Sequence, residues 1–182
     1  MKKEVIYALF PELMEIEDET LRAASVLAFQ LAIEKGGWRE DTVELVPVTV
    51  NWKMCKRNLI NHIHDVTKTC IDNYENLHPL YAANGIAFDR DIIIAGALLH
   101  DIGKFLEFTL EDGKPVLNKE ASLMRHPLSG ALLAAQAALP EKIVHLIAMH
   151  SFEGDQSKQS AESAFVRSID DFVFKCTVFG IH

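Results

Sequence analysis

The sequence predicts an all-α protein that forms a single helical domain, with room for one small hairpin. Apolar residues recur at helical spacing over most of the chain, and glycines and prolines mark the turns between these segments. With 49% hydrophobic and 24% charged residues, the chain of 182 residues can bury a sizeable core. A chain of this length fits one domain. We therefore expect residues 1–182 to form one domain, in which residues 1–50 are a helical N-terminal extension.

Six helices are predicted, most of them with a recognisable start or stop signal. They cover residues 21–35, 53–74, 92–99, 127–139, 140–150 and 161–179. Asp18 or Thr20 can cap the first of these helices, and Asp89 or Asp91 can cap the third. Pro127 suits the first turn of the fourth helix, where its missing N–H is not needed.

The segments between these helices are predicted to be connectors. Residues 38–51 contain four valines, but Pro47 disfavours a strand, so we expect an extended connector there. Residues 104–119 are expected to form a loop, whose turn at residues 111–115 allows the flanking residues to pair as a small hairpin. The polar residues 153–160 are expected to form a second loop.

The charge balance disfavours a nucleic-acid polymer as a partner. The chain has 18 Lys and Arg against 26 Asp and Glu, a net charge of -8, and such a surface repels a phosphate backbone. A small phosphorylated substrate stays compatible, because bound divalent metals can reverse the sign of the local field. Five of the acidic residues gather within residues 12–19, which we interpret as a solvated helix entry rather than a metal site.

Cysteine usage and hydropathy predict a cytoplasmic protein without a membrane partner. Cys55, Cys70 and Cys176 lie far apart and form no Cys-x-x-Cys pair, which favours reduced and mostly buried thiols over disulfides or a thiolate zinc site. The N-terminal apolar run is short and is followed by Pro11, unlike a secretory signal. No stretch approaches the ~18 apolar residues of a membrane helix.

Two side chains of the type that binds metals stand together at the end of a buried apolar helix. His100 and Asp101 follow the pair Leu98-Leu99, and Gly103 then lets the chain turn away. Burying a histidine beside an aspartate is costly unless something compensates both groups. A divalent cation does so, because it binds a neutral imidazole nitrogen and a carboxylate oxygen together. A metal site at His100 and Asp101 is therefore a hypothesis, although a His-Asp pair taken alone is common and mostly structural.

Two further histidines stand at helix ends and strengthen this prediction. His126 precedes Pro127 and therefore projects from the first turn of its helix. His150 ends its helix three residues after Ile147, on the inward face. Either histidine alone would more often be a core residue than a ligand. Their occurrence around one His-Asp pair favours a metal site.

In this order, the motifs resemble the HD superfamily of metal-dependent phosphohydrolases. The matching pattern is His62 with Val66, then Leu98-Leu99-His100-Asp101-Ile102-Gly103-Lys104, then His126-Pro127-Leu128-Ser129-Gly130, then His150, and then a late aspartate. The resemblance covers residues 58–174, and its most specific part is the Leu-Leu-His-Asp-Ile-Gly-Lys segment.

The resemblance implies a mainly helical HD-type bundle and a specific set of metal ligands. It implies one metal held by His62, His100, Asp101 and the late aspartate. It also implies a second metal held by His126 and His150, with Asp101 bridging the two ions. We therefore expect one or two divalent transition metal ions. Ligands of this kind without thiolates suit iron, manganese, nickel, cobalt or zinc.

Two of the implied ligands have a close neighbour in the sequence as an alternative. His64 could replace His62, although the spacing to Val66 favours His62. The late aspartate is Asp170 or Asp171. Asp170 lies at the edge of the apolar stripe of the last helix, whereas Asp171 lies on the face that is expected to meet solvent, and we choose Asp170. The stripe consists of Phe165, Val166, Ile169, Phe172, Val173 and Cys176.

The function implied is hydrolysis of a small phosphorylated metabolite or nucleotide by a metal-activated water. Asp101 would hold both ions and orient the nucleophile, and Lys104 would contact a substrate phosphate, with a plain solvent-exposed lysine as the alternative. Two other functions share the ligand set: a di-iron oxygenase, and a metal-stabilised interaction module without turnover. The Gly-Tyr-Pro motif of the cyclic-dinucleotide branch is missing after His150, which argues against that substrate.

Overall fold

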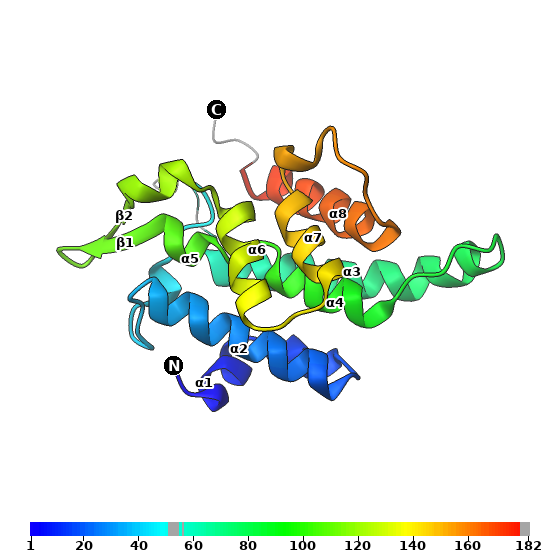
Figure 1. The fold of residues 1–182 in the computed structure, drawn as a ribbon, viewed down its shortest axis with the longest axis horizontal. Helices are drawn as coiled ribbons and strands as arrows, with labels where there is room; N and C mark the ends of the chain where they lie inside the picture. Colours follow the sequence, from blue (N-terminus) through cyan, green and yellow to red (C-terminus); the bar gives the residue numbers. More distant parts are fainter. Residues whose placement is uncertain (51–54, 56, 179–182) are drawn as a thin grey trace.

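The computed structural model describes residues 1–50, 55 and 57–178, and it is helical throughout apart from connectors and one hairpin (Figure 1). The α-helices are α1 (Lys3–Leu9), α2 (Glu19–Lys35), α3 (Leu59–Ala82), α4 (Arg90–Leu99), α5 (Lys104–Glu107), α6 (His126–Gln136), α7 (Glu141–Met149) and α8 (Ala161–Val178). Short 3-10 helices are η1 (Pro11–Glu15), η2 (Val43–Leu45), η4 (Lys119–Leu123) and η5 (Phe152–Gly154). The predicted all-α fold with one small hairpin is confirmed. None of the helices in the described part of the chain is long and apolar enough to cross a membrane.

Side-chain caps fix where the principal helices begin. The Asp18 carboxylate accepts hydrogen bonds from two backbone N–H groups in the first turn of α2. The Asp89 carboxylate accepts one hydrogen bond from a backbone N–H group in the first turn of α4. These contacts decide between the residues that were predicted as alternatives. Asp91 has a different role, because its carboxylate accepts hydrogen bonds from the backbone N–H groups of Glu17 and Asp18. It thereby ties the start of α2 to the start of α4.

Helix α3 differs from its prediction at both ends. The predicted start at Lys53 lies outside the described residues, and the helix begins at Leu59, where the Asn58 side chain forms a reciprocal cap with Asn61. The predicted end at Tyr74 is wrong, since the helix continues to Ala82 and carries Pro79 inside it. The polar residues after Tyr74 do not break a helix, and the extra turns project from the body of the protein (Figure 1).

The connectors are more structured than predicted. The segment from residue 104 opens with the helical turn α5 instead of a loop. The hairpin that follows is confirmed, with β1 (Phe108–Glu111) paired antiparallel to β2 (Lys114–Leu117). Its turn places both Asp112 and Gly113 at positive φ. Residues 38–50 form a connector that contains η2, and η5 replaces the first part of the loop predicted at 153–160.

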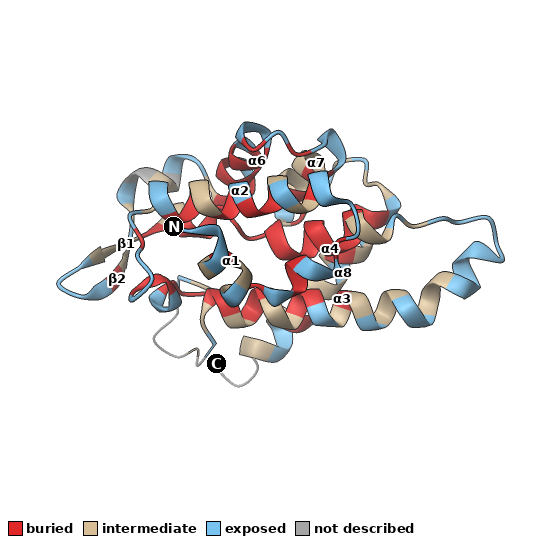
Figure 2. Cartoon of the chain, turned by 90° about the horizontal axis from the view of Figure 1, so that it is seen from below, coloured by how far each residue is buried: buried red, intermediate tan, exposed pale blue. Residues whose placement is uncertain are grey.

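Helix α4 is the centre of the fold. All of its residues from Ile92 to Leu99 are buried, and it packs against α2, α3, α7 and α8. Figure 2 shows buried residues on the faces that these helices turn toward one another. Because α4 runs through the middle of the protein, the two residues that follow it, His100 and Asp101, lie deep inside.

The N-terminal segment shares its apolar core with the helices that bear the motifs. Phe10 and Phe29 stack with their ring centroids 4.0 Å apart, in the same cluster as Leu98 of α4 and Ile147 of α7. This shared cluster supports our proposal that residues 1–182 form one domain that includes the N-terminal extension.

Several predictions of burial are wrong. The apolar stripe predicted for the last helix includes Phe172, but this residue is 61% exposed, because only the side of α8 that carries Val166 and Val173 faces the core. Cys176 is likewise exposed, and of the three free cysteines only Cys70 is buried. The predicted helix end at residue 179 lies outside the described residues.

Candidate metal centre

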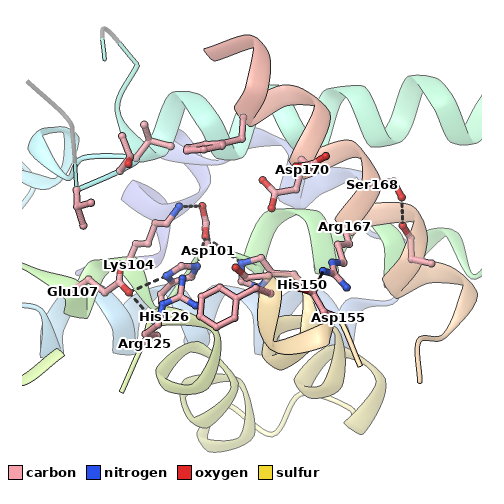
Figure 3. A pocket seen from close by; sticks show the side chains of 18 of the residues that line it. Asp101, Lys104, Glu107, Arg125, His126, His150, Asp155, Arg167, Ser168 and Asp170 are labelled. Atoms are coloured by element: carbon pink, nitrogen blue, oxygen red, sulfur yellow. Dashed lines mark hydrogen bonds and ion pairs between the residues drawn. The ribbon is translucent and has the colours of Figure 1, made fainter. Parts of the chain in front are cut away.

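Six of the residues singled out in the sequence meet in one cluster at the end of α4. They are His62 on α3, His100 and Asp101 after α4, His126 at the start of α6, His150 after α7, and Asp170 on α8. Five are buried and Asp170 is partly exposed. Figure 3 shows Asp101, His126, His150 and Asp170 around a common space. Five separate segments of the chain therefore contribute to one site.

The cluster consists of two groups that share a boundary at Asp101. The first group is His62, His100 and Asp170, and the second group is Asp101, His126 and His150, with ligand atoms within 4.8 Å of one another in each. Asp101 Oδ2 faces the first group, 3.4 Å from His62 Nε2 and 3.5 Å from His100 Nε2. Its Oδ1 faces the second group, 3.3 Å from His126 Nε2 and 3.4 Å from His150 Nε2. One carboxylate thus offers an oxygen to each group.

The ring orientations suit metal binding. In His100 and in His150, Nδ1 donates a hydrogen bond of 2.7 Å to the backbone carbonyl three residues earlier. His126 Nδ1 lies 2.9 Å from Oε1 of Glu107. Because Nδ1 carries a proton in each of these contacts, the neutral form of each ring has its lone pair on Nε2, which points into the cluster, as in metal-ligating histidines.

Atoms of the first group are too crowded to be satisfied by hydrogen bonds alone. His62 Nε2 lies 3.0 Å from Asp170 Oδ1 and 3.3 Å from His100 Nε2. A proton on His62 Nε2 can form a hydrogen bond with only one of these neighbours. The Nδ1 atom of His62 is buried and has no hydrogen-bond partner among the described residues. A cation between these nitrogens and oxygens would be contacted by all of them. Four imidazoles and two carboxylates without a thiolate fit a divalent transition metal.

Without a metal, protonated groups compensate the buried carboxylates. Burial alone would raise the pKa of Asp101, but the ammonium of Lys104 and the ring of His100 hold it well below its usual range. Burial alone would lower the pKa of His100, but the carboxylates of Asp101 and Asp170 outweigh it and raise that pKa to about 10. The pKa of His62 is lowered by burial. The cluster therefore attracts positive charge.

Lys104 is buried instead of solvent-exposed. It is 9% exposed, and its Nζ lies 2.5 Å from Asp101 Oδ2. It also lines the pocket in front of the cluster. The alternative of a plain surface lysine is thereby wrong, whereas its contact with a substrate phosphate stays a prediction.

Two glycines allow the start of α6 to approach the His-Asp pair. A Cβ atom on Gly103 would lie 2.1 Å from the carbonyl oxygen of His126 and 2.8 Å from the backbone nitrogen of Gly130. Any side chain at Gly103 would therefore push α6 away and move His126 from Asp101. The close contact gives this glycine a packing role in addition to the turn expected from the sequence.

The neighbouring alternatives lie outside the cluster. His64 Nδ1 lies 2.9 Å from both carboxylate oxygens of Glu12, a residue that was expected to be solvated but is only 9% exposed. Glu12 is buried because η1 folds against α3. Asp171 is exposed and forms an ion pair with Lys175. The geometry thus agrees with the choice of His62 and Asp170, and metal binding by the six residues stays a prediction.

Glu107 is a functional candidate that the sequence did not indicate. Its Oε1 accepts hydrogen bonds from both the backbone N–H and the Nδ1 of His126, each 2.9 Å long. Burial raises the pKa of Glu107, but His126 outweighs it and the net pKa is lowered. The carboxylate therefore fixes the ring of His126 from behind. No local pattern connects the two residues, which are 19 positions apart.

A pocket of about 890 Å³ opens from the cluster to the surface. Asp101, His126, His150 and Asp170 form part of its wall (Figure 3). The remaining wall includes three basic residues and several apolar ones, among them Lys104, Arg125, Arg167, Val48, Phe152 and Phe174. A volume of this size suits a small molecule, since ligand pockets typically measure about 300–1,000 Å³.

Comparisons with known proteins agree with the resemblance seen in the sequence. The chain is 25% identical over 126 residues to a dihydroneopterin 2',3'-cyclic phosphate phosphodiesterase of Methanocaldococcus jannaschii. The match covers 69% of this chain and 49% of that protein, so the chain spans about half the length of the relative. No solved structure matches the chain significantly. Residues 70–173, more than half of the chain, match the HD domain, and the protein therefore belongs to the HD domain family.

Proposed function

We propose that this protein is a metal-dependent phosphohydrolase that acts on a small phosphorylated metabolite or nucleotide. Membership of the HD domain family supports this activity at the level of the family. The observation that carries the proposal is the position of Asp101, whose two carboxylate oxygens face two separate groups of ligand-type residues. A shared carboxylate of this kind suits a pair of ions better than a structural core.

The proposed ligands are the six residues of the cluster, which would hold one or two divalent metal ions. When bound, such ions supply a hydroxide nucleophile at neutral pH and neutralise charge on phosphoryl oxygens. The backbone carbonyls behind His100 and His150 and the carboxylate behind His126 keep the three rings in place. Asp101 holds the two groups at a fixed separation.

Lys104 is the proposed contact for the substrate phosphate. Its ammonium is next to Asp101 and lines the pocket, so it reaches the space where a phosphoryl group would meet the cluster. A buried ammonium interacts with a phosphoryl oxygen more strongly than a solvated one does. Lys104 therefore stabilises the negative charge that develops as the nucleophile attacks.

A cyclic phosphodiester is the first compound class to test, because the named activity of the archaeal relative is of this type. In this reaction the oxygen of water forms a bond to phosphorus, and one of the two ring P–O bonds breaks. The leaving oxygen takes a proton, and the product is a phosphomonoester with a free hydroxyl group. The pocket volume of about 890 Å³ is compatible with a compound of nucleotide size.

The test combines metal analysis with an ester panel. Protein purified without added ions would be analysed for metals, then loaded in turn with manganese, ferrous iron, cobalt, nickel and zinc. We expect metal-dependent opening of nucleoside 2',3'-cyclic phosphates or cleavage of phosphomonoesters, with no activity in the Asp101→Ala variant. If no ester is cleaved with any metal, the proposal is wrong. Oxygen consumption by the ferrous protein would point to the oxygenase alternative instead.

A further inference from the structure

An arginine and a phenylalanine form a stacked pair in the wall of the pocket. The guanidinium carbon of Arg125 lies 4.0 Å from the centre of the Phe152 ring. Both residues line the pocket, and Figure 3 shows Arg125 next to His126. Neither residue belongs to the six-residue cluster, and the sequence indicated neither of them. The pair thus needs an explanation of its own.

The stacked pair is held in position by a carboxylate. Glu153, which immediately follows Phe152, forms an ion pair with Nη1 of Arg125. The Glu153 side chain is mostly buried, with 17% exposed. Because a guanidinium is planar and delocalised, an ion pair at its edge and a ring at its face fix the orientation of its plane. The pocket therefore has a flat, preorganised piece of wall.

The stacked pair lies close to the second group in both sequence and space. Arg125 immediately precedes His126, and Phe152 is two residues after His150. The Nε2 atoms of these two histidines lie 3.3 and 3.4 Å from Asp101 Oδ1. A planar group resting on the stacked pair would therefore be next to a phosphate located at the cluster.

Exposure alone does not distinguish Phe152 from other surface phenylalanines. Phe152 is 61% exposed, and so is Phe172 on α8. Single exposed apolar residues are normal and need no functional explanation. Phe152 differs because it lines the pocket and bears a fixed guanidinium, whereas Phe172 is not among the residues that line this pocket. Phe172 therefore provides a matched control.

We propose that Arg125 and Phe152 form a recognition platform for a planar heteroaromatic ring of the substrate. Nucleobases and similar rings stack on arginine planes and on aromatic side chains. The preferred substrates are then phosphate esters of nucleoside-like compounds rather than esters of glycerol or simple sugars. The inference rests on the proposed function in that the phosphate of the ligand is taken to lie at the metal cluster.

Binding of two phosphomonoesters to the metal-loaded protein tests the platform through affinity rather than through the rate of cleavage. Guanosine 2'-monophosphate and glycerol 2-phosphate both carry a phosphate on a secondary alcohol, and only the nucleotide has a heteroaromatic ring. We expect titration calorimetry to give at least tenfold tighter binding of the nucleotide. Phe152→Ala should weaken nucleotide binding roughly 5- to 150-fold, the range for loss of one base–aromatic stack. Binding of glycerol 2-phosphate should not change.

Control variants separate recognition from folding. Phe172→Ala should bind the nucleotide as the unchanged protein does, and Phe152→Tyr should retain tight binding because it keeps a ring. Melting temperatures would be measured for every variant. Equal affinity for the two esters, no measurable nucleotide binding, or unchanged nucleotide affinity in a folded Phe152→Ala protein would overturn the platform.

The binding test and the hydrolysis test can fail separately. Hydrolysis of cyclic phosphates with no preference for a heteroaromatic ring would contradict the proposed platform and leave the proposed function intact. Ring-selective binding without cleavage of any ester would support the platform and contradict the hydrolase proposal.

Discussion

Two glutamate–histidine pairs in this protein have similar local geometry and different surroundings. Glu12 on η1 contacts His64 on α3, and Glu107 contacts His126 at the cluster, with 2.9 Å between Nδ1 and a carboxylate oxygen in both pairs. In both, burial raises the pKa of the glutamate, and contact with the histidine outweighs it, so that the pKa is lowered. Neither pair by itself indicates a metal site.

The two pairs differ in what the histidine ring contacts on the side away from the glutamate. His126 Nε2 lies 3.3 Å from Asp101 Oδ1, so its carboxylate partner acts on a ring that faces the cluster. The ring of His64 packs near Phe10 instead, at 6.0 Å between ring centroids. A glutamate behind a histidine therefore matters for metal binding only where other ligand-type atoms converge in front of that ring.

The largest expected effect follows from removing Asp101, the residue that connects the two groups. Asp101→Ala should abolish hydrolysis and binding of the second metal, because it removes both carboxylate oxygens, one of which faces each group. Circular dichroism should still show a helical protein. Elemental analysis and the ester assay on the same preparation check this, and near-normal turnover in the variant would contradict the mechanism.

The double change His126→Ala plus His150→Ala should have the second-largest effect on metal content and activity. It should leave about one metal per chain, since His62, His100 and Asp170 are untouched. Activity should fall, because the remaining residues would hold one ion, and the charge neutralisation that a second ion would supply would be lost. Metal stoichiometry and melting temperature would be measured on the same protein.

The opposite outcome of this double change is equally specific. If both histidines are core residues satisfied by hydrogen bonds, the metal count would not change and only the melting temperature would fall. His150 Nδ1 does donate to a backbone carbonyl, so this outcome has a structural basis. Unchanged stoichiometry with a lower melting temperature would remove the case for two metals.

Replacing Glu107 sharpens the comparison between the two pairs. Glu107→Gln keeps an acceptor for the backbone N–H of His126 but removes the charge behind its ring. Loss of such a partner typically weakens metal affinity roughly 10- to 100-fold, and we expect this for the second metal only. Competition with a metal-binding dye would measure it. Glu111→Gln, a change at an exposed glutamate on β1, is the control and should have no effect.

The sequence predicted those parts of the site that depend on local chemistry. A His-Asp pair after a buried apolar helix and a histidine before a proline are visible without a structure, and both lie in the cluster. The starts of α2 and α4 were predictable for the same reason, because the caps Asp18 and Asp89 act within one turn.

Contacts made by tertiary packing were not predictable. Glu107 reaches His126 only because Gly103 and Gly130 let α6 approach the end of α4. Arg125 and Phe152 are 27 positions apart and stack because α6 and α7 pack together. Helical periodicity also misjudged burial, as at Phe172, since it identifies a face but not how much of that face a neighbour covers.

The smallest expected effect is on stability alone, from Glu12→Gln. Because the pKa of Glu12 is lower in the folded state than its ordinary value of 4.5, this carboxylate stabilises the fold above about pH 4.5 and loses its effect as the pH falls through its folded pKa. At pH 7 the free energy of unfolding of the variant should fall by about 1.5–3 kcal/mol, the size of a hydrogen bond to a charged group. Urea unfolding at pH 7 and at pH 3 checks this, and the difference between the two proteins should shrink at pH 3. Metal content and hydrolysis should be unchanged, and a loss of metal in Glu12→Gln would mean that the two pairs are not separate in function.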